Sequence, residues 1–164
     1  MAELTNLEEK LAEVTGLAMA AEAAGGKVTT LTEEQDKDLV STLQKMAKEA
    51  AETTQRCEQV AGTFEGKKTA ILDEARDVKR KGAEMLKTYL DEEADALDGL
   101  EFLTMAEAAE VGHWGVLGRM SEHAGNPRVM ELTTWALPIQ QRHFQTVLDG
   151  SLQLAAAEDP NGTS

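Results

Sequence analysis

The chain has 164 residues, a length typical of one compact domain. Its 30 acidic and 16 basic side chains give a formal net charge of −14 at pH 7, and so acidic a surface repels nucleic-acid phosphates and anionic lipid headgroups. We therefore expect neither a nucleic-acid partner nor a membrane partner. Hydrophobic residues make up 41% and charged residues 28%, so the charge does not indicate disorder.

The sequence also predicts a cytoplasmic protein. Uncharged stretches such as residues 14–21 and 132–141 fall well short of the roughly 18 apolar residues that cross a bilayer. The start, MAELTNLEEKL, contains no basic region followed by an apolar stretch, so no secretory signal is expected. Cys57 is the single cysteine and cannot form an internal disulfide, which is typical of a reducing compartment.

Two long helices are predicted in the first part of the chain. Apolar side chains three or four positions apart indicate a first helix that begins at Asn6 and ends at Gly25-Gly26. Thr32 and Gln35 then form a capping-box pattern, which predicts the start of a second helix. Its apolar seam continues over residues 39–64 as a nearly unbroken heptad pattern.

A connector follows the second helix. Gly66 and Gly82 bracket one short amphipathic segment, and a second short segment follows Gly82, so we expect two short helices here. The basic run at residues 79–81 is surrounded by acidic residues. We interpret it as a solvated helix end rather than a nucleic-acid patch.

Two further main helices are predicted after the connector. The third starts near Asp98 or Gly99, ends at Gly125 and carries apolar residues on two faces, so it should be largely buried. Asn126-Pro127 is a favourable start for the fourth, which runs to about Ala157 and should bend at Pro138. These elements predict an all-α fold, an up-down four-helix bundle with a short helical insert between its second and third main helices. Residues 1–157 would form this single domain and residues 158–164 a flexible tail.

Polar residues on the third and fourth main helices are candidates for chemistry. Glu107, Glu110 and His113 follow one another at intervals of three residues, and Gln140 precedes His143 by three residues. Side chains separated by one helical turn project to the same side. A carboxylate followed three residues later by histidine is the unit from which di-iron and di-manganese sites are made in a bundle core.

The chain resembles the ferritin-like superfamily, and within it a branch of bacterial stress-associated proteins with a helical insert. Residues 52–64 resemble the second helix of that branch, and residues 65–68 resemble the turn into its insert. Residues 107–115 resemble its pair of glutamates before an aromatic-glycine step. Gln140 departs from the pattern, because the branch usually has a glutamate near this position.

The resemblance implies a site for iron or manganese and a role in stress or in metal and oxygen handling. Each of the first two helices should add a carboxylate. On the second helix Glu49 flanks the apolar seam, and Glu52 points largely away from it. The candidate metal ligands are Glu107, Glu110, His113, Gln140, His143 and Glu52.

Other interpretations of the same residues remain open. Buried Glu and His side chains also arise where polar groups simply satisfy one another by hydrogen bonding. The chain would then be a metal-free bundle that serves as a dimerisation or partner-binding scaffold. A third interpretation is an amphipathic protein that coats lipid or protects other proteins. A homodimer is expected, Trp114 and Trp135 should be core or interface anchors, and Cys57 should be a small buried hydrophobe.

Overall fold

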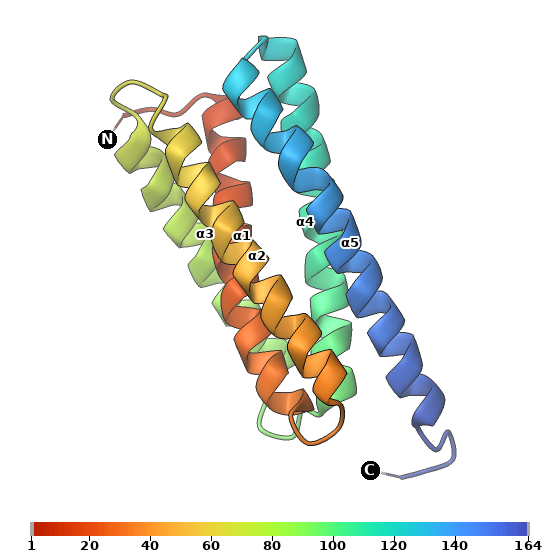
Figure 1. The fold of residues 1–164 in the computed structure, drawn as a ribbon. Helices are drawn as coiled ribbons and strands as arrows, with labels where there is room; N and C mark the ends of the chain where they lie inside the picture. Colours follow the sequence, from red (N-terminus) through yellow and green to blue (C-terminus); the bar gives the residue numbers. More distant parts are fainter. Residues whose placement is uncertain (1, 164) are drawn as a thin grey trace.

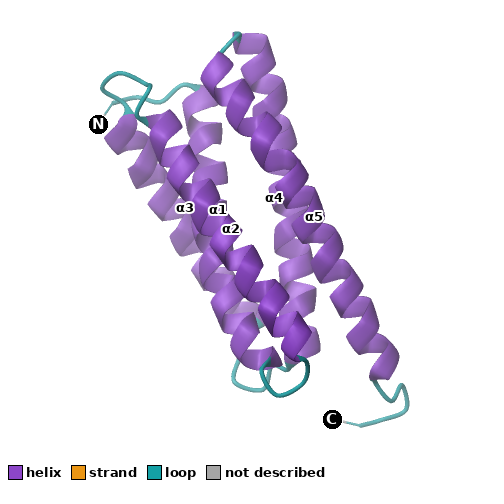
Figure 2. Ribbon diagram, viewed as in Figure 1, coloured by secondary structure: helices purple, strands orange, loops and turns teal. Residues whose placement is uncertain are grey.

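The computed structural model describes residues 2–163 and contains five α-helices, with no strand in that range (Figure 2). The predicted all-α class is therefore confirmed. The helices are α1 (Asn6–Thr32), α2 (Lys37–Ala61), α3 (Lys68–Tyr89), α4 (Ala96–Ala124) and α5 (Pro127–Ala157). Successive helices run in opposite directions (Figure 1). Within the described range, no helix is both long enough and apolar enough to span a bilayer.

Four helices form a ring around the core. Helix α1 packs against α2 and α4, and α5 closes the ring by packing against both α4 and α2. Helix α3 lies outside this ring, against α1 and on the far side from α5 (Figure 1). The connector thus adds a fifth helix to the bundle.

The predicted end of the first helix is wrong, because α1 continues through Gly25 and Gly26 to Thr32. Val28 is fully buried beyond the glycines, and the burial of such side chains outweighs the roughly 1 kcal/mol that a helical glycine costs. Thr32 consequently closes α1. The side chain of Asp36, not of Thr32, caps the start of α2.

The connector prediction is also wrong, because α3 is one continuous helix of 22 residues. Gly82 lies inside it, and a Cβ atom there would come within 2.9 Å of the Cβ of Ala20. Gly82 therefore permits close contact with α1 instead of breaking the helix. The basic run at residues 79–81 lies within α3 and is exposed, so it is not a helix end.

The turn between the last two helices follows the prediction. Gly125 adopts a left-handed conformation with φ +63° after α4, and Asn126 caps α5 with Pro127 in its first turn. Asp95 caps α4, which begins at Ala96, slightly earlier than expected. Helix α5 continues through Pro138 to Ala157, and the bend at this proline stays a prediction.

The prediction that α4 is largely buried is wrong for one of its two apolar faces. Leu100, Leu103 and Trp114 are buried, whereas Ala109 and Val116 on the second face are exposed. Helix α3 packs along α1 and contacts α4 only sparsely. The second face of α4 is therefore only partly covered: Phe102 on it is buried, whereas Ala109 and Val116 are exposed.

The core consists of two apolar clusters with a polar layer between them. One cluster contains Leu11, Cys57, Trp114 and Val129, and the other contains Val28, Leu43, Leu100 and Val147. Side chains of α4 and α5 at positions 107, 110, 140 and 143 lie between these clusters along the helices and are buried. We refer to Glu107, Glu110, Gln140 and His143 as the interior polar layer.

Candidate interior polar site

The interior polar layer contains four of the six predicted site residues, and it places one pair of them, Glu107 and His143, close together. Glu107, Glu110, Gln140 and His143 are each at most 3% exposed. Glu107 Oε2 lies 3.8 Å from His143 Nδ1. Because α4 and α5 are antiparallel, one turn onward on α4 corresponds to one turn back on α5. This register places Glu110 level with Gln140.

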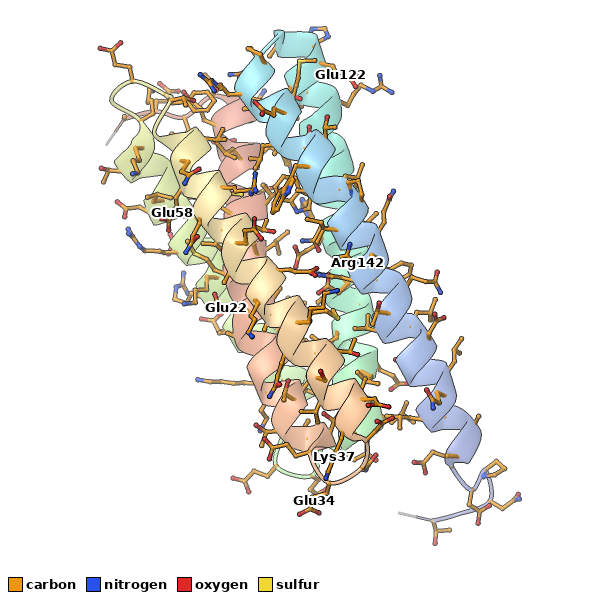
Figure 3. All side chains as sticks on the ribbon, viewed as in Figure 1. Glu22, Glu34, Lys37, Glu58, Glu122 and Arg142 are labelled. Atoms are coloured by element: carbon orange, nitrogen blue, oxygen red, sulfur yellow. The ribbon has the colours of Figure 1, made fainter. Side chains whose placement is uncertain are left out.

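A carboxylate on α2 orients the imidazole of His143. Glu49 Oε2 lies 2.7 Å from His143 Nε2. Arg142, labelled on α5 in Figure 3, also donates a hydrogen bond to Glu49. Burial alone would raise the pKa of Glu49, but the hydrogen bonds and charges of His143 and Arg142 lower it below its usual value. Glu49 is therefore ionised at neutral pH and acts as an acceptor.

The protonation of the ring follows from this contact. Burial lowers the pKa of His143, so the imidazole is neutral at pH 7 and carries one N–H. Because the ionised Glu49 only accepts, we assign that hydrogen to Nε2, and Nδ1, which lies 3.8 Å from Glu107 Oε2, is then unprotonated. A histidine that donates one N–H to a carboxylate and presents its other nitrogen is typical of metal ligation.

The two glutamates of the layer are poorly satisfied. Burial raises the pKa of Glu107 to about 8, and burial together with the neighbouring charge of Glu107 raises the pKa of Glu110 well above its usual value. Oε2 of each glutamate and Oε1 of Gln140 have no hydrogen-bond partner. Each such buried atom costs about 1–3 kcal/mol, and native proteins contain few of them.

The other two predicted site residues lie elsewhere. His113 is six positions from Glu107, and this spacing turns it to another side of the helix. Its Nδ1 lies 3.2 Å from Oε2 of Glu13 on α1. Glu52 is 51% exposed and pairs with Arg56 at 3.0 Å. Glu49, one turn before Glu52, is the α2 carboxylate that reaches the layer.

Two residues that contact the layer were not among the predicted ligands: Glu49 was considered on the second helix but Glu52 was chosen, and Arg142 was not considered. Glu49 only flanks the apolar seam of α2, and Arg142 stands beside His143 on α5. The ion pair of Arg142 with Glu49 neutralises the partly buried carboxylate of Glu49. The sequence did contain a signal for this contact: Arg142 stands beside His143 on α5, and Glu49 is an acidic residue at the edge of the apolar seam of α2.

Cys57 and Trp114 complete the surroundings of the layer. Burial raises the pKa of the Cys57 thiol to about 12, so the thiol is protonated and unreactive in the folded chain. Trp114 is fully buried. Trp135 is partly buried, and the guanidinium carbon of Arg56 lies 4.1 Å from the centre of its ring. The expected buried role of Cys57 is confirmed.

The donor atoms of the layer fit a metal ion in type but not in arrangement. Carboxylate, amide and imidazole donors suit iron and manganese, and three oxygen atoms of the layer lack partners. Among residues 2–163, however, no three His, Cys, Asp or Glu side chains stand together as a ligand group. His143 lies between Glu49 and Glu107, so its two nitrogens face different carboxylates.

Comparisons of the chain with protein-family models, curated proteins and solved structures gave no match.

Proposed function

We propose that the chain is a ferritin-like bundle that binds iron or manganese in its interior polar layer and acts in stress-linked metal or oxygen handling. One observation carries the proposal. His143 Nδ1 lies 3.8 Å from Oε2 of Glu107, an oxygen without a hydrogen-bond partner, inside a layer where Glu110 and Gln140 also have such oxygens. A cation at this point would satisfy atoms that otherwise cost free energy.

The proposed ligands are Glu107, Glu110, Gln140 and His143, and Glu49 with Arg142 would hold the ring of His143 in place. When bound, such a metal supplies electron exchange with oxygen or peroxide. Glu107 and Glu110 would release their protons on binding, so metal affinity rises with pH.

Charge balance favours a single divalent ion. The layer contains two carboxylates, and Gln140 adds no charge. Two negative charges neutralise one divalent cation, whereas the charge of Glu49 is already balanced by Arg142. A second ion would remain uncompensated in an apolar interior, which is strongly unfavourable.

The test is metal loading of protein purified without chelator, with elemental analysis and thermal unfolding. We expect about one manganese or iron ion per chain. At 100 times the dissociation constant, metal should stabilise the fold by about 2.7 kcal/mol, which raises the Tm by roughly 5–10 °C for a chain of this size.

Matched variants localise the site. Glu107→Gln and Glu110→Gln should abolish both the bound metal and the rise in Tm, while the exposed Glu52→Gln should retain both. A metal content near zero after loading with iron and manganese contradicts the proposal. Equal loading of Glu52→Gln and Glu107→Gln would contradict its location.

A second candidate is a metal-free scaffold for dimerisation or partner binding. It is favoured by the lack of an assembled three-residue ligand group within residues 2–163, and by the exposed apolar side chains Met105 and Val116 on α4. If the chain is such a scaffold, chelator should leave its Tm unchanged, and light scattering should give the mass of a dimer. A chelator-dependent loss of Tm would contradict it.

A further inference from the structure

An exposed seam with an uncharged middle runs along α4. It consists of the residues at positions 101, 105, 108, 112, 115 and 119, alternately four and three residues apart, and all six are exposed. This spacing places them along one side of the helix, as in the contact seam of a coiled coil. Between Glu101 and Arg119, a stretch that the structure describes in full, no exposed residue is charged. Such a surface is unusual in a chain with 28% charged residues.

Gly112 and Gly115 lie over open space on this seam. Among residues 2–163, a Cβ atom on either would meet no neighbouring atom within 4 Å, whereas a Cβ on Gly16 or Gly82 would collide with the adjacent helix. A glycine inside a helix costs up to about 1 kcal/mol relative to alanine. Packing among the described residues therefore does not explain the two glycines of the seam. A helix that packs on the seam from outside would explain them, because small residues let two helix axes approach closely.

The seam is complementary in shape to a second copy of itself when the two α4 helices lie antiparallel. With a two-fold axis midway between positions 108 and 112, Ala108 of one copy lies against Gly112 of the second copy. The same axis places Met105 against Gly115, so the long side chain enters the space that the glycine leaves open. Each contact occurs twice, as an interface with two-fold symmetry requires.

The charges at the ends of the seam favour the same orientation. Glu101 and Arg119 lie equally far from the axis on opposite sides, so each glutamate faces an arginine of the second copy. In a parallel pair, like charges would face each other. Arg119 pairs with Glu122 within the chain at 2.9 Å, but its side chain is 86% exposed and open to a further contact. Two chains of net charge −14 repel each other, and the uncharged middle of the seam is a surface where they can meet.

The apolar surface continues from the seam onto α3. Met85 of α3 and Met105 of the seam line the same groove, and both are exposed. Tyr89, also exposed, lies beside Phe102 with 6.0 Å between the ring centres. These side chains widen the apolar surface available to a second copy beyond one helix, which a stable interface requires.

We propose that the chain forms a homodimer in which the α4 seam packs antiparallel against the same seam of a second copy. The seam contains no residue of the interior polar layer, so the dimer requires no metal. It is also the surface that a dimerising scaffold would use.

Sedimentation equilibrium of the full chain in chelator-containing buffer measures the dimer. We expect one monomer–dimer equilibrium with a single dissociation constant. Gly112→Leu should fill the space that the second helix enters and weaken the dimer by about tenfold or more. Gly26→Leu is the matched control, because Gly26 is an exposed glycine of α1 whose Cβ also meets nothing within 4 Å among residues 2–163. It should leave the dimer unchanged, and both variants should keep the helical circular dichroism of the wild type.

A charge exchange tests the register. Glu101→Arg or Arg119→Glu alone should weaken the dimer by about tenfold, because two contacts between unlike charges become contacts between like charges. The double variant should restore the dissociation constant of the wild type. Glu131→Arg, at an exposed position on α5, changes the net charge as much as Glu101→Arg does and should not weaken the dimer.

Three results would overturn the proposal: a monomer at every concentration, equal effects of Gly112→Leu and Gly26→Leu, and a double charge exchange that fails to restore the dimer. A monomer would leave the metal proposal intact, because the interior polar layer lies within one chain. A Tm that depends on chelator would contradict the scaffold function without affecting the α4 interface.

Discussion

Substitution of Glu107 by Gln tests whether the interior layer carries a buried, protonated carboxyl group. The amide keeps the shape of the side chain but does not ionise. The pKa of Glu107 is raised from 4.5 to about 8 in the folded chain, so the folded state binds more protons than the unfolded state between these values. By linkage, the free energy of unfolding of the wild type therefore falls as pH rises from about 4.5 to about 8.

The magnitude follows from the same two values. A shift from 4.5 to about 8, at 1.36 kcal/mol per unit, gives about 5 kcal/mol. That is comparable with the whole stability of many domains, which is 5–15 kcal/mol. Glu110 titrates together with Glu107, so the pair shares this dependence.

The assay is urea unfolding of metal-free protein in chelator at pH 5, 6, 7 and 8. The stability of Glu107→Gln relative to the wild type should increase steadily over this range and reach several kcal/mol at pH 8. Glu52→Gln is the matched control, because Glu52 is exposed and its pair with Arg56 contributes little. Parallel curves for the wild type and Glu107→Gln would refute the protonated carboxyl group.

Three further predictions concern the fold. Gly16→Ala should destabilise the chain by about 1–3 kcal/mol in urea, because its Cβ would lie 2.4 Å from a carbonyl oxygen of Ala75. Gly26→Ala, where nothing lies within 4 Å, should stabilise it by about 0.5–1 kcal/mol, and the same sign for both would contradict the close helix contact. Cys57, buried with a pKa of about 12, should react with a maleimide only as fast as the protein opens, so rapid labelling under native conditions would contradict its burial. Pro138→Ala should raise the free energy of unfolding by about 1–3 kcal/mol, and no gain would show that the proline costs α5 nothing.

The helix boundaries show which local signals suffice. The end of α4 and the start of α5 were predictable because Gly125, Asn126 and Pro127 give three independent signals at one place. At Gly82, by contrast, the glycine was the only indication of a helix end. A glycine either ends a helix or allows a neighbouring helix to approach closely. Only the position of Ala20 on α1 decides between them, and local sequence does not contain that information.

The interior polar layer could likewise be predicted only in part from the sequence. The one-turn spacing of Glu107 and Glu110, and of Gln140 and His143, placed each pair on one helix face, and the fold buries all four. The choice of Glu52 as the α2 ligand went against the apolar seam, because Glu49 flanks the seam whereas Glu52 points largely away from it and is exposed. Which of them reaches the core depends on the position of α5, whose Arg142 and His143 both contact Glu49.

The neutral side chain of Gln140 affects both the stability of the layer and the proposed binding of a metal ion. A third carboxylate at this position would add a charge beside Glu107 and Glu110, whose pKa values are already raised by burial, and the metal-free chain would bear that cost. The neutral amide avoids the cost and still presents an oxygen atom without a partner. Under the proposed function, the layer would hold one divalent ion with the two charges of Glu107 and Glu110, and a bundle that held two ions would need the additional negative charge that Gln140 does not supply.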